Sequence, residues 1–275
     1  MSEDQAAPER TSRRGRRPRR EQSRASRIAY GVIGVVGELL ITVGVLLFGF
    51  LVWQLWWTDV QGNRAQAQVV QELVREPAPS ATPSDGGTAK PVVAKPRHDD
   101  PPVMKEPKHA VTFATMRVPR WKGEPERPIS EGTDRPTVLD PKGVGHYEGT
   151  AMPGDVGNFA VAGHRTTFAK PFNRIAELKK GDAVVVRTAT LDGGPGTDTW
   201  YVYKVVSTQI VAPTDVGVIA PVPNEPGTSP TERYMTMTTC HPMFSARERY
   251  IVHLKLDYWA PVSDGTPAEL LKAAS

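Results

Sequence analysis

The sequence of 275 residues contains a single cysteine, Cys240, so it lacks the partner that an intramolecular disulfide requires. A free cysteine is more often a small buried apolar residue than a reactive group. Cys240, however, ends the β-prone stretch 235–240 immediately before His241-Pro242, where a strand gives way to a loop. A substrate can reach a thiol at such a position, so Cys240 is a candidate nucleophile whose role depends on its neighbours.

Charged side chains are nearly absent from residues 28–57, where Glu38 is the only one. A helix of this length, at about 1.5 Å per residue, exceeds a bilayer core of roughly 30 Å. The apolar run is also longer than the roughly 7–15 residues of a cleaved signal peptide, although Ala65-Gln66-Ala67 resembles a cleavage site. We therefore predict a retained transmembrane anchor at 28–57.

Acidic residues at the N-terminus are outnumbered by arginines. Residues 1–27 hold nine arginines and four acidic residues, a net charge of +5, whereas the whole chain carries +4. The positive-inside rule therefore places this tail in the cytoplasm and everything after Thr58 outside the cell. We interpret the arginines as a topology determinant that also contacts membrane lipid, in preference to a nucleic-acid role.

Residues 77–107 are poor in apolar side chains and contain eight prolines. Such a composition buries too little apolar surface to offset the chain entropy lost on folding. We predict a semi-extended extracellular stalk here, within a spacer at 58–110. It leads to a folded domain at 111–260 and a C-terminal tail at 261–275.

The domain at 111–260 has no internal repeat and consists of short apolar runs separated by Gly and Pro. Runs rich in Val, Ile, Thr and aromatic residues predict the strands of a β-barrel or sandwich. They cover 111–118, 158–162, 183–188, 200–211, 234–240 and 250–258. One helix is predicted at 171–178, because Phe172, Ile175 and Leu178 recur at helical spacing.

The same domain carries several short motifs in a fixed order. They are Gly145-His146-Tyr147-Glu148-Gly149-Thr150, Pro153-Gly154, Ala162-Gly163-His164-Arg165, Pro213-Thr214-Asp215-Val216, Thr236-Met237-Thr238-Thr239-Cys240 and Arg249-Tyr250-Ile251-Val252. Together they resemble a sortase over the whole of 111–260. The short Cys-to-Arg spacing and the run Gly-His-Arg-Thr-Thr are similar to class E sortases of high-GC Gram-positive bacteria. The usual Thr-Leu-x-Thr-Cys reads Thr-Met-Thr-Thr-Cys here, a mild apolar exchange.

This resemblance implies a mainly β fold: an eight-stranded sortase barrel with one or two short helices. It implies a calcium-independent cysteine transpeptidase that needs no cofactor or metal. Such an enzyme cleaves a Leu-(Pro/Ala)-x-Thr-Gly signal between Thr and Gly and transfers the protein to an amine. The expected partners are surface proteins with a C-terminal sorting signal and a peptidoglycan precursor amine. The expected location is the cell membrane, with a single span and an extracellular catalytic domain.

By the same resemblance, Cys240 is the nucleophile, His164 donates a proton to the leaving amine, and Arg249 stabilises the oxyanion. His241 is a rival because it adjoins the thiol, but consecutive residues of an extended chain point to opposite faces. Arg247 competes with Arg249, since both project to one side if the strand begins early. The Arg-x-Ile-Val resemblance selects Arg249.

Three further residues, Thr166, Phe168 and Thr239, are predicted to contact the substrate. The proline-rich stretch 221–230 is predicted to form one wall of the binding groove. His253 is interpreted as a structural residue of its strand.

Other readings of the lone cysteine fit less well. Papain-like peptidases place cysteine before histidine in the sequence, and L,D-transpeptidases carry a Ser-His-Gly-Cys motif; neither pattern occurs here. The alternative from a different class is a catalytically inactive, membrane-tethered binding or scaffold domain of the cell envelope. An inert Cys240 thiol would favour that alternative.

Overall fold

The computed structural model of the protein describes residues 24–74, 92–189 and 196–274. The predicted arginine-rich tail up to residue 23 and the part of the predicted stalk at 75–91 lie outside the described residues. The chain divides into two compact units, Met1–Trp53 and Gln54–Ser275, which we describe separately.

The first unit contains the beginning of α1 (Arg24–Leu73), the longest helix of the described chain. Between Ile28 and Trp53 its side chains are almost all apolar and exposed; Leu46 and Phe48, for example, are 67% and 69% exposed. A helix that is apolar on every side needs an apolar surrounding such as lipid. Within the described residues, the stretch Ile28–Leu73 is the one helix long and apolar enough to cross a membrane.

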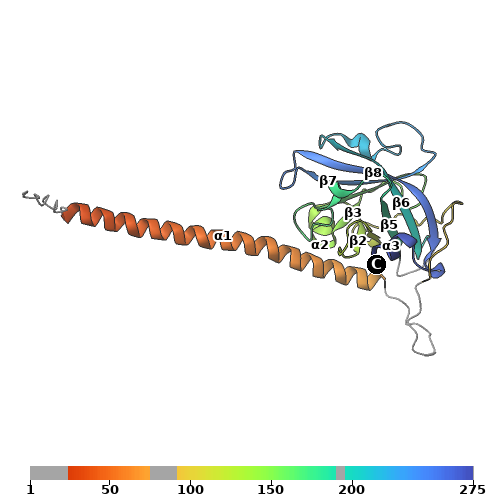
Figure 1. Ribbon diagram of the computed structural model, residues 1–275. Helices are drawn as coiled ribbons and strands as arrows, with labels where there is room; N and C mark the ends of the chain where they lie inside the picture. The colour runs from red at the N-terminus through yellow and green to blue at the C-terminus, as the bar shows by residue number, and fades with distance from the viewer. Residues whose placement is uncertain (1–23, 75–91, 190–195, 275) are drawn as a thin grey trace, which may run out of the picture. The chain divides into compact units, whose positions relative to one another are not determined.

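The second unit is built around a barrel of eight strands, which closes in the order β1-β2-β3-β4-β7-β8-β6-β5 within the described residues (Figure 1). The strands are β1 (Thr112–Arg117), β2 (Arg127–Glu131), β3 (Val144–His146), β4 (Gly157–Gly163), β5 (Ala183–Thr188), β6 (Thr199–Val211), β7 (Arg233–His241) and β8 (Glu248–Pro261). The predicted eight-stranded barrel is confirmed. Closure gives every strand two neighbours, so no strand is a sheet edge along its whole length.

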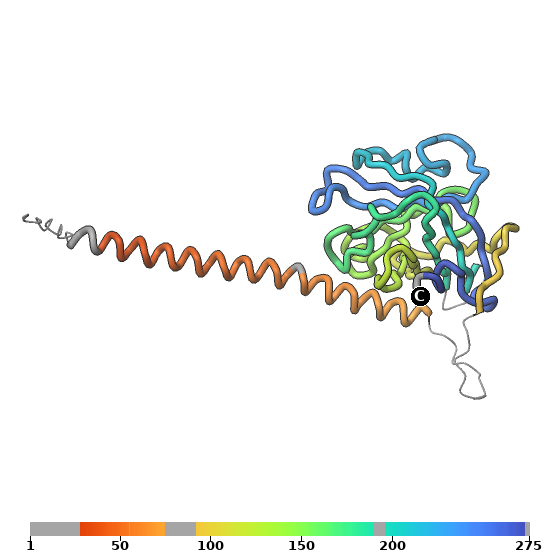
Figure 2. Tube along the Cα trace, viewed as in Figure 1, coloured from red at the N-terminus to blue at the C-terminus, as the bar shows by residue number. Residues whose placement is uncertain are grey.

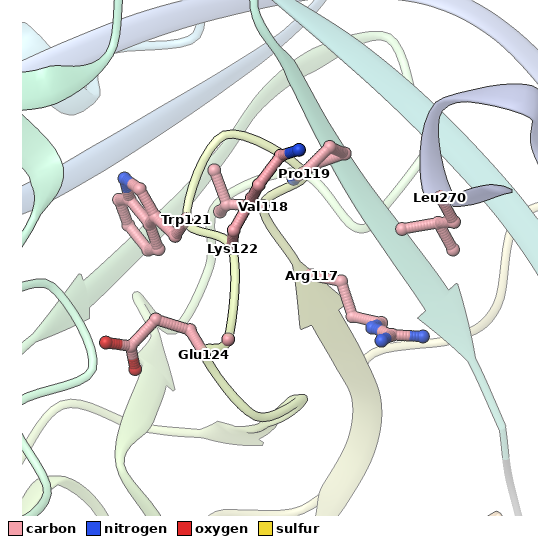
Figure 3. Close-up of a pocket in the computed structure, with 8 residues that line it drawn as sticks. Arg117, Val118, Pro119, Trp121, Lys122, Glu124 and Leu270 are labelled. Carbon is pink, nitrogen blue, oxygen red and sulfur yellow. The ribbon is translucent and has the colours of Figure 1, made fainter. Parts of the chain in front are cut away.

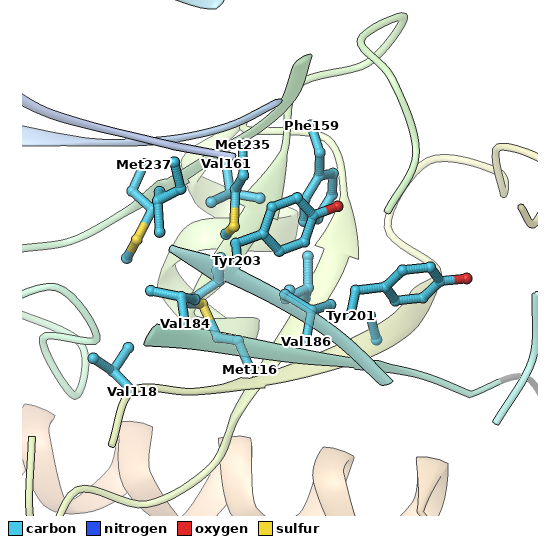
Figure 4. Packing of buried hydrophobic residues seen from close by; sticks show 14 of the residues in the cluster. Met116, Val118, Phe159, Val161, Val184, Val186, Tyr201, Tyr203, Met235 and Met237 are labelled. Carbon is cyan, nitrogen blue, oxygen red and sulfur yellow. The ribbon is translucent and has the colours of Figure 1, made fainter. Parts of the chain in front are cut away.

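Side chains alternate along each strand, and the inward set forms the core. On β7, Met235 and Met237 are fully buried and lie near Phe159 and Tyr203 in the barrel interior (Figure 4). Each large apolar side chain buried in this way contributes about 1.5–3 kcal/mol. The same alternation turns Cys240, three residues beyond Met237, to the outer face of the sheet.

The helices of this unit are short. They are η1 (Arg135–Leu139), α2 (Asp140–Lys142), η2 (Ile175–Glu177), η3 (Val216–Ile219), η4 (Val262–Asp264) and α3 (Ala268–Ala274). The helix predicted at 171–178 is a series of turns with one 3-10 turn. Phe172, Ile175 and Leu178 are buried against the barrel, as their spacing suggests. A series of turns, and not a continuous helix, places them there.

An extended strap, residues 92–104, lies on the outside of the barrel (Figure 2). Its backbone forms single β-bridges to Thr266 and Trp259. Two of its carbonyls also accept side-chain hydrogen bonds: Asp99 O from the indole Nε1 of Trp259 at 2.9 Å, and Pro102 O from the Tyr201 hydroxyl at 2.5 Å. The folded unit therefore already includes residues 92–104, ahead of the boundary at 111 that the sequence indicates. A proline-rich composition disfavours regular secondary structure but allows an extended chain to pack on an existing surface.

The C-terminal end also belongs to the folded unit. After β8, α3 packs Leu270 against Trp200 and Tyr258 in a small second cluster. Glu269 accepts hydrogen bonds from the Tyr258 hydroxyl and from Lys204. The segment predicted as a tail at 261–275 thus closes one side of the barrel as far as residue 274.

Candidate active site

The parallel pairing of β4 and β7 brings the predicted histidine and cysteine to the same end of the barrel. Ala162 of β4 is the register partner of Thr238 of β7. His164 and Cys240 each follow two residues later, where β4 has ended and β7 is ending. The Thr239 hydroxyl donates to Gly163 O at 2.7 Å and ties the two strand ends together.

Arg249 reaches the same place from the antiparallel neighbour of β7. It is the register partner of Cys240 in the β7–β8 pair. Side chains of directly opposed residues lie on one face of a sheet, with Cβ atoms about 4.5–5.5 Å apart. The Arg249 Nη1 donates to the carbonyls of Ala246 and Glu248, both at 3.0 Å. The competitor Arg247 is exposed and precedes the strand.

His164 is held by two neighbours. Its Nε2 lies 2.6 Å from Asp140 Oδ1, at the start of α2, and its ring centroid is 5.3 Å from that of Phe168. The two polar side chains are largely shielded, with 15% and 24% of their surfaces exposed. A carboxylate on one ring nitrogen fixes the ring orientation and assigns proton transfer to the other nitrogen.

Arg165 contacts the backbone of Cys240 and the side chain of the residue that follows it, His241. It is 7% exposed, and its Nη1 donates to Cys240 O at 3.3 Å and to His241 Nδ1 at 2.8 Å. Its Cζ lies 5.5 Å from the ring centroid of Tyr250. Because a guanidinium only donates hydrogen bonds, His241 Nδ1 is an acceptor in this contact. His241 is therefore occupied by Arg165, which weakens its claim as the proton donor.

The predicted substrate contacts lie in different surroundings. Thr239 is 4% exposed and faces the opposite side of β7 from Cys240, so its hydroxyl joins strands instead of facing a ligand. Phe168 packs on His164. Thr166 is half-buried in the loop that follows β4.

The loop between β6 and β7 is attached to the outer face of the same sheet. Asn158 Nδ2 donates to Ala220 O at 2.9 Å, and the Thr236 hydroxyl donates to Asn158 Oδ1 at 2.8 Å. The stretch 221–230, predicted as a wall of the groove, follows this attachment point and is half-buried or exposed.

His253 belongs to the structure of the sheet. It is 3% exposed, and its Nδ1 lies 2.9 Å from the Thr236 hydroxyl, its register partner across the strand pair. Burial lowers the pKa of His253 to about 4, because the charged form loses its hydration. The imidazole is therefore neutral at pH 7 and serves as a hydrogen-bonding core residue.

A pocket of about 240 Å³ lies elsewhere, lined by residues that include Arg117, Trp121, Lys122, Glu124 and Leu270 (Figure 3). Its lining contains neither a nucleophilic cysteine nor a histidine. Among the described residues, no group of three or more His, Cys, Asp and Glu side chains is arranged to hold a metal ion.

Two residues of the site were missed at the level of the sequence. Arg165 follows His164 directly within the Gly-His-Arg motif, so its position next to the histidine is visible in the sequence. The direction of its side chain is not, because the loop after β4 sets it. Asp140 lies 24 residues before His164 and meets it only because β3 and β4 pair. Nothing local in the sequence marks that contact.

Comparisons with known proteins agree with this geometry. A family model described as the sortase domain matches residues 116–257. Two curated relatives from Streptomyces coelicolor align over 86% of this chain: sortase SrtE1, 38% identical with 60% of its length covered, and sortase SrtE2, 34% identical with 87% covered.

Solved structures give the same picture. The SrtA sortase of Actinomyces oris is 43% identical and superposes with a TM-score of 0.59, covering 64% of this chain and 97% of that one. Sortase E1 of S. coelicolor, solved with a tripeptide in its active site, is 38% identical with a TM-score of 0.52, covering 58% and 97%. With the family model, the relatives and the barrel in agreement, this chain belongs to the sortase family, and class E sortases are among its relatives.

Proposed function

We propose that this protein is a membrane-anchored sortase that cleaves a Leu-(Pro/Ala)-x-Thr-Gly sorting signal between Thr and Gly. It then transfers the protein to an amine of a peptidoglycan precursor. The observation that supports this most directly is the meeting of Cys240, His164 and Arg249 at the ends of β7, β4 and β8. These are the three groups that acyl transfer through a thioester needs.

In the first half of the reaction, the Cys240 thiolate attacks the carbonyl carbon of the signal threonine. The carbonyl oxygen becomes an oxyanion, which the Arg249 guanidinium stabilises. His164, as the imidazolium, gives its proton to the glycine nitrogen as the C–N bond breaks. The products are a thioester on Cys240 and a free amine on the departing peptide.

In the second half, the precursor amine attacks the thioester carbonyl. The now neutral His164 accepts the proton that the amine loses, the C–S bond breaks, and Cys240 leaves as the thiolate. The new amide joins the protein to the precursor. Water that reached the thioester would give hydrolysis instead, so exclusion of water decides the outcome.

Two neighbouring residues assist in this scheme. Asp140, on His164 Nε2, orients the ring and leaves Nδ1 for the mobile proton. Arg165 holds the peptide carbonyl of Cys240 and engages His241, so that a second imidazole does not compete for the thiol. The apolar helix Ile28–Leu73 would retain the enzyme at the membrane, where membrane-bound precursors are available.

The alternative, an inactive scaffold domain, is less well supported. A scaffold has no need of a half-buried free thiol beside an arginine and a carboxylate-bound histidine. Thiol reactivity separates the two: small electrophiles should alkylate Cys240 readily in the enzyme and slowly in a scaffold.

The proposal is tested with the full chain in detergent micelles and peptides carrying Leu-Ala-x-Thr-Gly or Leu-Pro-x-Thr-Gly. Mass spectrometry should detect the thioester on Cys240, and added glycine-type amine should divert the thioester from the acid product to an amide. Cys240→Ala should abolish the thioester. Arg249→Ala should lower turnover on the order of 10²-fold, whereas Arg247→Ala, its matched control, should change it little. Cleavage at another bond, or none with either peptide, would contradict the proposal.

A further inference from the structure

The C-terminal part of α1 belongs to the same compact unit as the barrel and turns one side toward it. Asp59, Gly62 and Gln66 recur at spacings of three and four residues, which places them on one helix face. Gly62 is buried and Gln66 is 1% exposed, whereas Gln61 and Gln68 are exposed. This face, Asp59, Gly62 and Gln66, is called the docking face below.

The docking face contacts the loop that follows His164. Gln66 Nε2 donates to Phe168 O at 3.2 Å, and Lys170 Nζ lies 2.6 Å from Asp59 Oδ2. Between these contacts the backbones approach so closely that a Cβ on Gly62 would lie 2.9 Å from the backbone N of Ala169. A side chain at Gly62 would therefore force the helix and the loop apart.

Gln66 also contacts the elements on the other side of His164. Its Oε1 accepts from Arg127 Nη1 at 2.9 Å, a buried guanidinium whose pKa is lowered by burial. A Cβ on Gly143 would lie only 2.7–2.8 Å from the atoms of the Gln66 amide, so the glutamine packs directly against this glycine. Gly143 ends the α2 turn that carries Asp140. One buried glutamine thus touches both chain segments that hold the histidine.

The loop itself is in an unfavourable backbone conformation. Phe168, Ala169 and Lys170 have φ values of 53°, 62° and 39°, three successive non-glycine residues in the left-handed region. L-residues adopt this region rarely and mostly singly, so such a run persists only where surrounding contacts impose it. The docking face supplies contacts to all three, and the Phe168 ring packs on His164.

We propose that Asp59, Gly62 and Gln66 are positioning residues. By docking on the barrel they hold the strained loop and its Phe168 against His164, so that turnover depends on the juxtamembrane part of α1. This inference rests on the proposed function, in which His164 is the proton donor. Undocking of the helix lets the loop relax, and the imidazole loses its alignment while Cys240, on β7, stays in place.

The first experiment compares Gln66→Ala with Gln68→Ala in the full chain in detergent micelles. Both changes remove the same side chain, but residue 68 lies on the exposed side of the helix. Misplacing a catalytic group costs up to about 10²-fold, so Gln66→Ala should lower kcat about 10-fold or more and leave KM within about twofold. Gln68→Ala should match the unchanged protein.

Exchanging the charges of the Asp59–Lys170 ion pair distinguishes loss of docking from loss of folding. Asp59→Lys should lower kcat, and the double variant Asp59→Lys with Lys170→Asp should recover it, because the ion pair is restored with reversed polarity. Recovery is incompatible with a general destabilisation. Equal kcat in Gln66→Ala and Gln68→Ala, or no recovery in the double variant, would overturn the proposal.

Hydrogen exchange provides a readout that does not need turnover. In Gln66→Ala the backbone amides of residues 165–172 should exchange faster than in Gln68→Ala, and those of β7 should not. Unchanged exchange in this loop would refute the docking. If the unchanged protein had no turnover, the proposed function would fail, and loop exchange would still decide whether the helix holds the loop.

Discussion

At the scale of single residues, the contact between Asp140 and His164 gives a specific test of how the imidazole is oriented. Asp140→Asn keeps the size of the side chain but allows its amide to donate to Nε2 and so select the wrong tautomer. Because Asp140 is partly exposed, water can replace part of its role. We expect turnover to fall on the order of 10-fold to 10²-fold, at the low end of the range for general acid catalysis.

The measurement is single-turnover cleavage of a sorting-signal peptide at several pH values. Asp140→Asn should lower the rate at each of these pH values, since the group that orients the His164 imidazole has changed. Asp134→Asn is a suitable control, because Asp134 caps the neighbouring turn through Thr137 and has no contact with His164 among the described residues. Unchanged rates in Asp140→Asn would remove Asp140 from the mechanism.

A second residue-scale prediction concerns His253 and acid stability. Its folded-state pKa of about 4 lies below the usual 6.5, so between these pH values the unfolded chain binds a proton that the native state does not. Stability is therefore complete above about pH 6.5 and falls as the pH drops toward 4. The contribution between pH 7.5 and pH 5 is about 2 kcal/mol.

Urea unfolding of the full chain in detergent, followed by near-UV circular dichroism, measures this effect. His253→Gln removes the titrating group, so its midpoint should fall less between pH 7.5 and pH 5 than that of the unchanged protein. His98→Gln, at an exposed position, should leave the acid-induced fall as it is. An identical fall in all three proteins would show that His253 does not titrate as we infer.

The sequence indicated which residues belong to the candidate site better than it indicated where their side chains lie. Cys240, His164 and Arg249 lie within short motifs, so they could be selected before any fold was known. Thr239, predicted to contact the substrate, lies on the face of β7 opposite to Cys240, and this placement depends on the alternation of side chains along the strand. The partner Asp140 comes from a segment whose approach is decided by tertiary pairing alone.

At the scale of elements, the strap at 92–104 is expected to contribute to the stability of the barrel. It buries Met104, which is 7% exposed, and supplies backbone acceptors for Trp259 and Tyr201. Burial of a methionine contributes about 1.5–3 kcal/mol and each hydrogen bond about 1 kcal/mol. A chain that begins at residue 108 should therefore melt about 10 °C below one that begins at residue 92.

Differential scanning calorimetry of the two shortened chains gives this comparison. Met104→Ala in the longer chain should reproduce part of the loss, whereas Lys95→Ala, at an exposed position of the strap, should not. Equal melting temperatures of the two chains would mean that the strap lies on the barrel without stabilising it.

Elements with a clear apolar pattern were the ones that the sequence could locate. The six predicted strands correspond to β1 and β4 to β8, whereas β2 and β3 were not found. Both are short, and β2 begins Arg127-Pro128, a combination that local propensity disfavours in a strand. Burial of all five β2 residues shows that tertiary pairing outweighs that propensity.

At the scale of the whole molecule, the charge asymmetry and the apolar helix together predict a defined topology. The cluster of arginines before residue 28 favours the cytoplasmic side, and the helix from Ile28 is long enough to span the membrane. The domain that follows would then lie outside the cell. The segment 75–91, rich in Pro, Ser, Ala and Gly, is the expected site of proteolysis between anchor and domain, since the strap that follows packs on the barrel.

Proteinase K is added to cells whose wall has been removed and whose membrane is intact. On a denaturing gel, the full chain should then be replaced by a fragment of about the size of residues 92–275. An epitope tag before residue 1 should stay intact on the anchor fragment, because the membrane shields it. In lysed cells the tag should be degraded as well, which controls for protease access. Loss of the tag with an intact domain in unlysed cells would reverse the orientation and place Cys240 inside the cell, on the opposite side of the membrane from the cell wall.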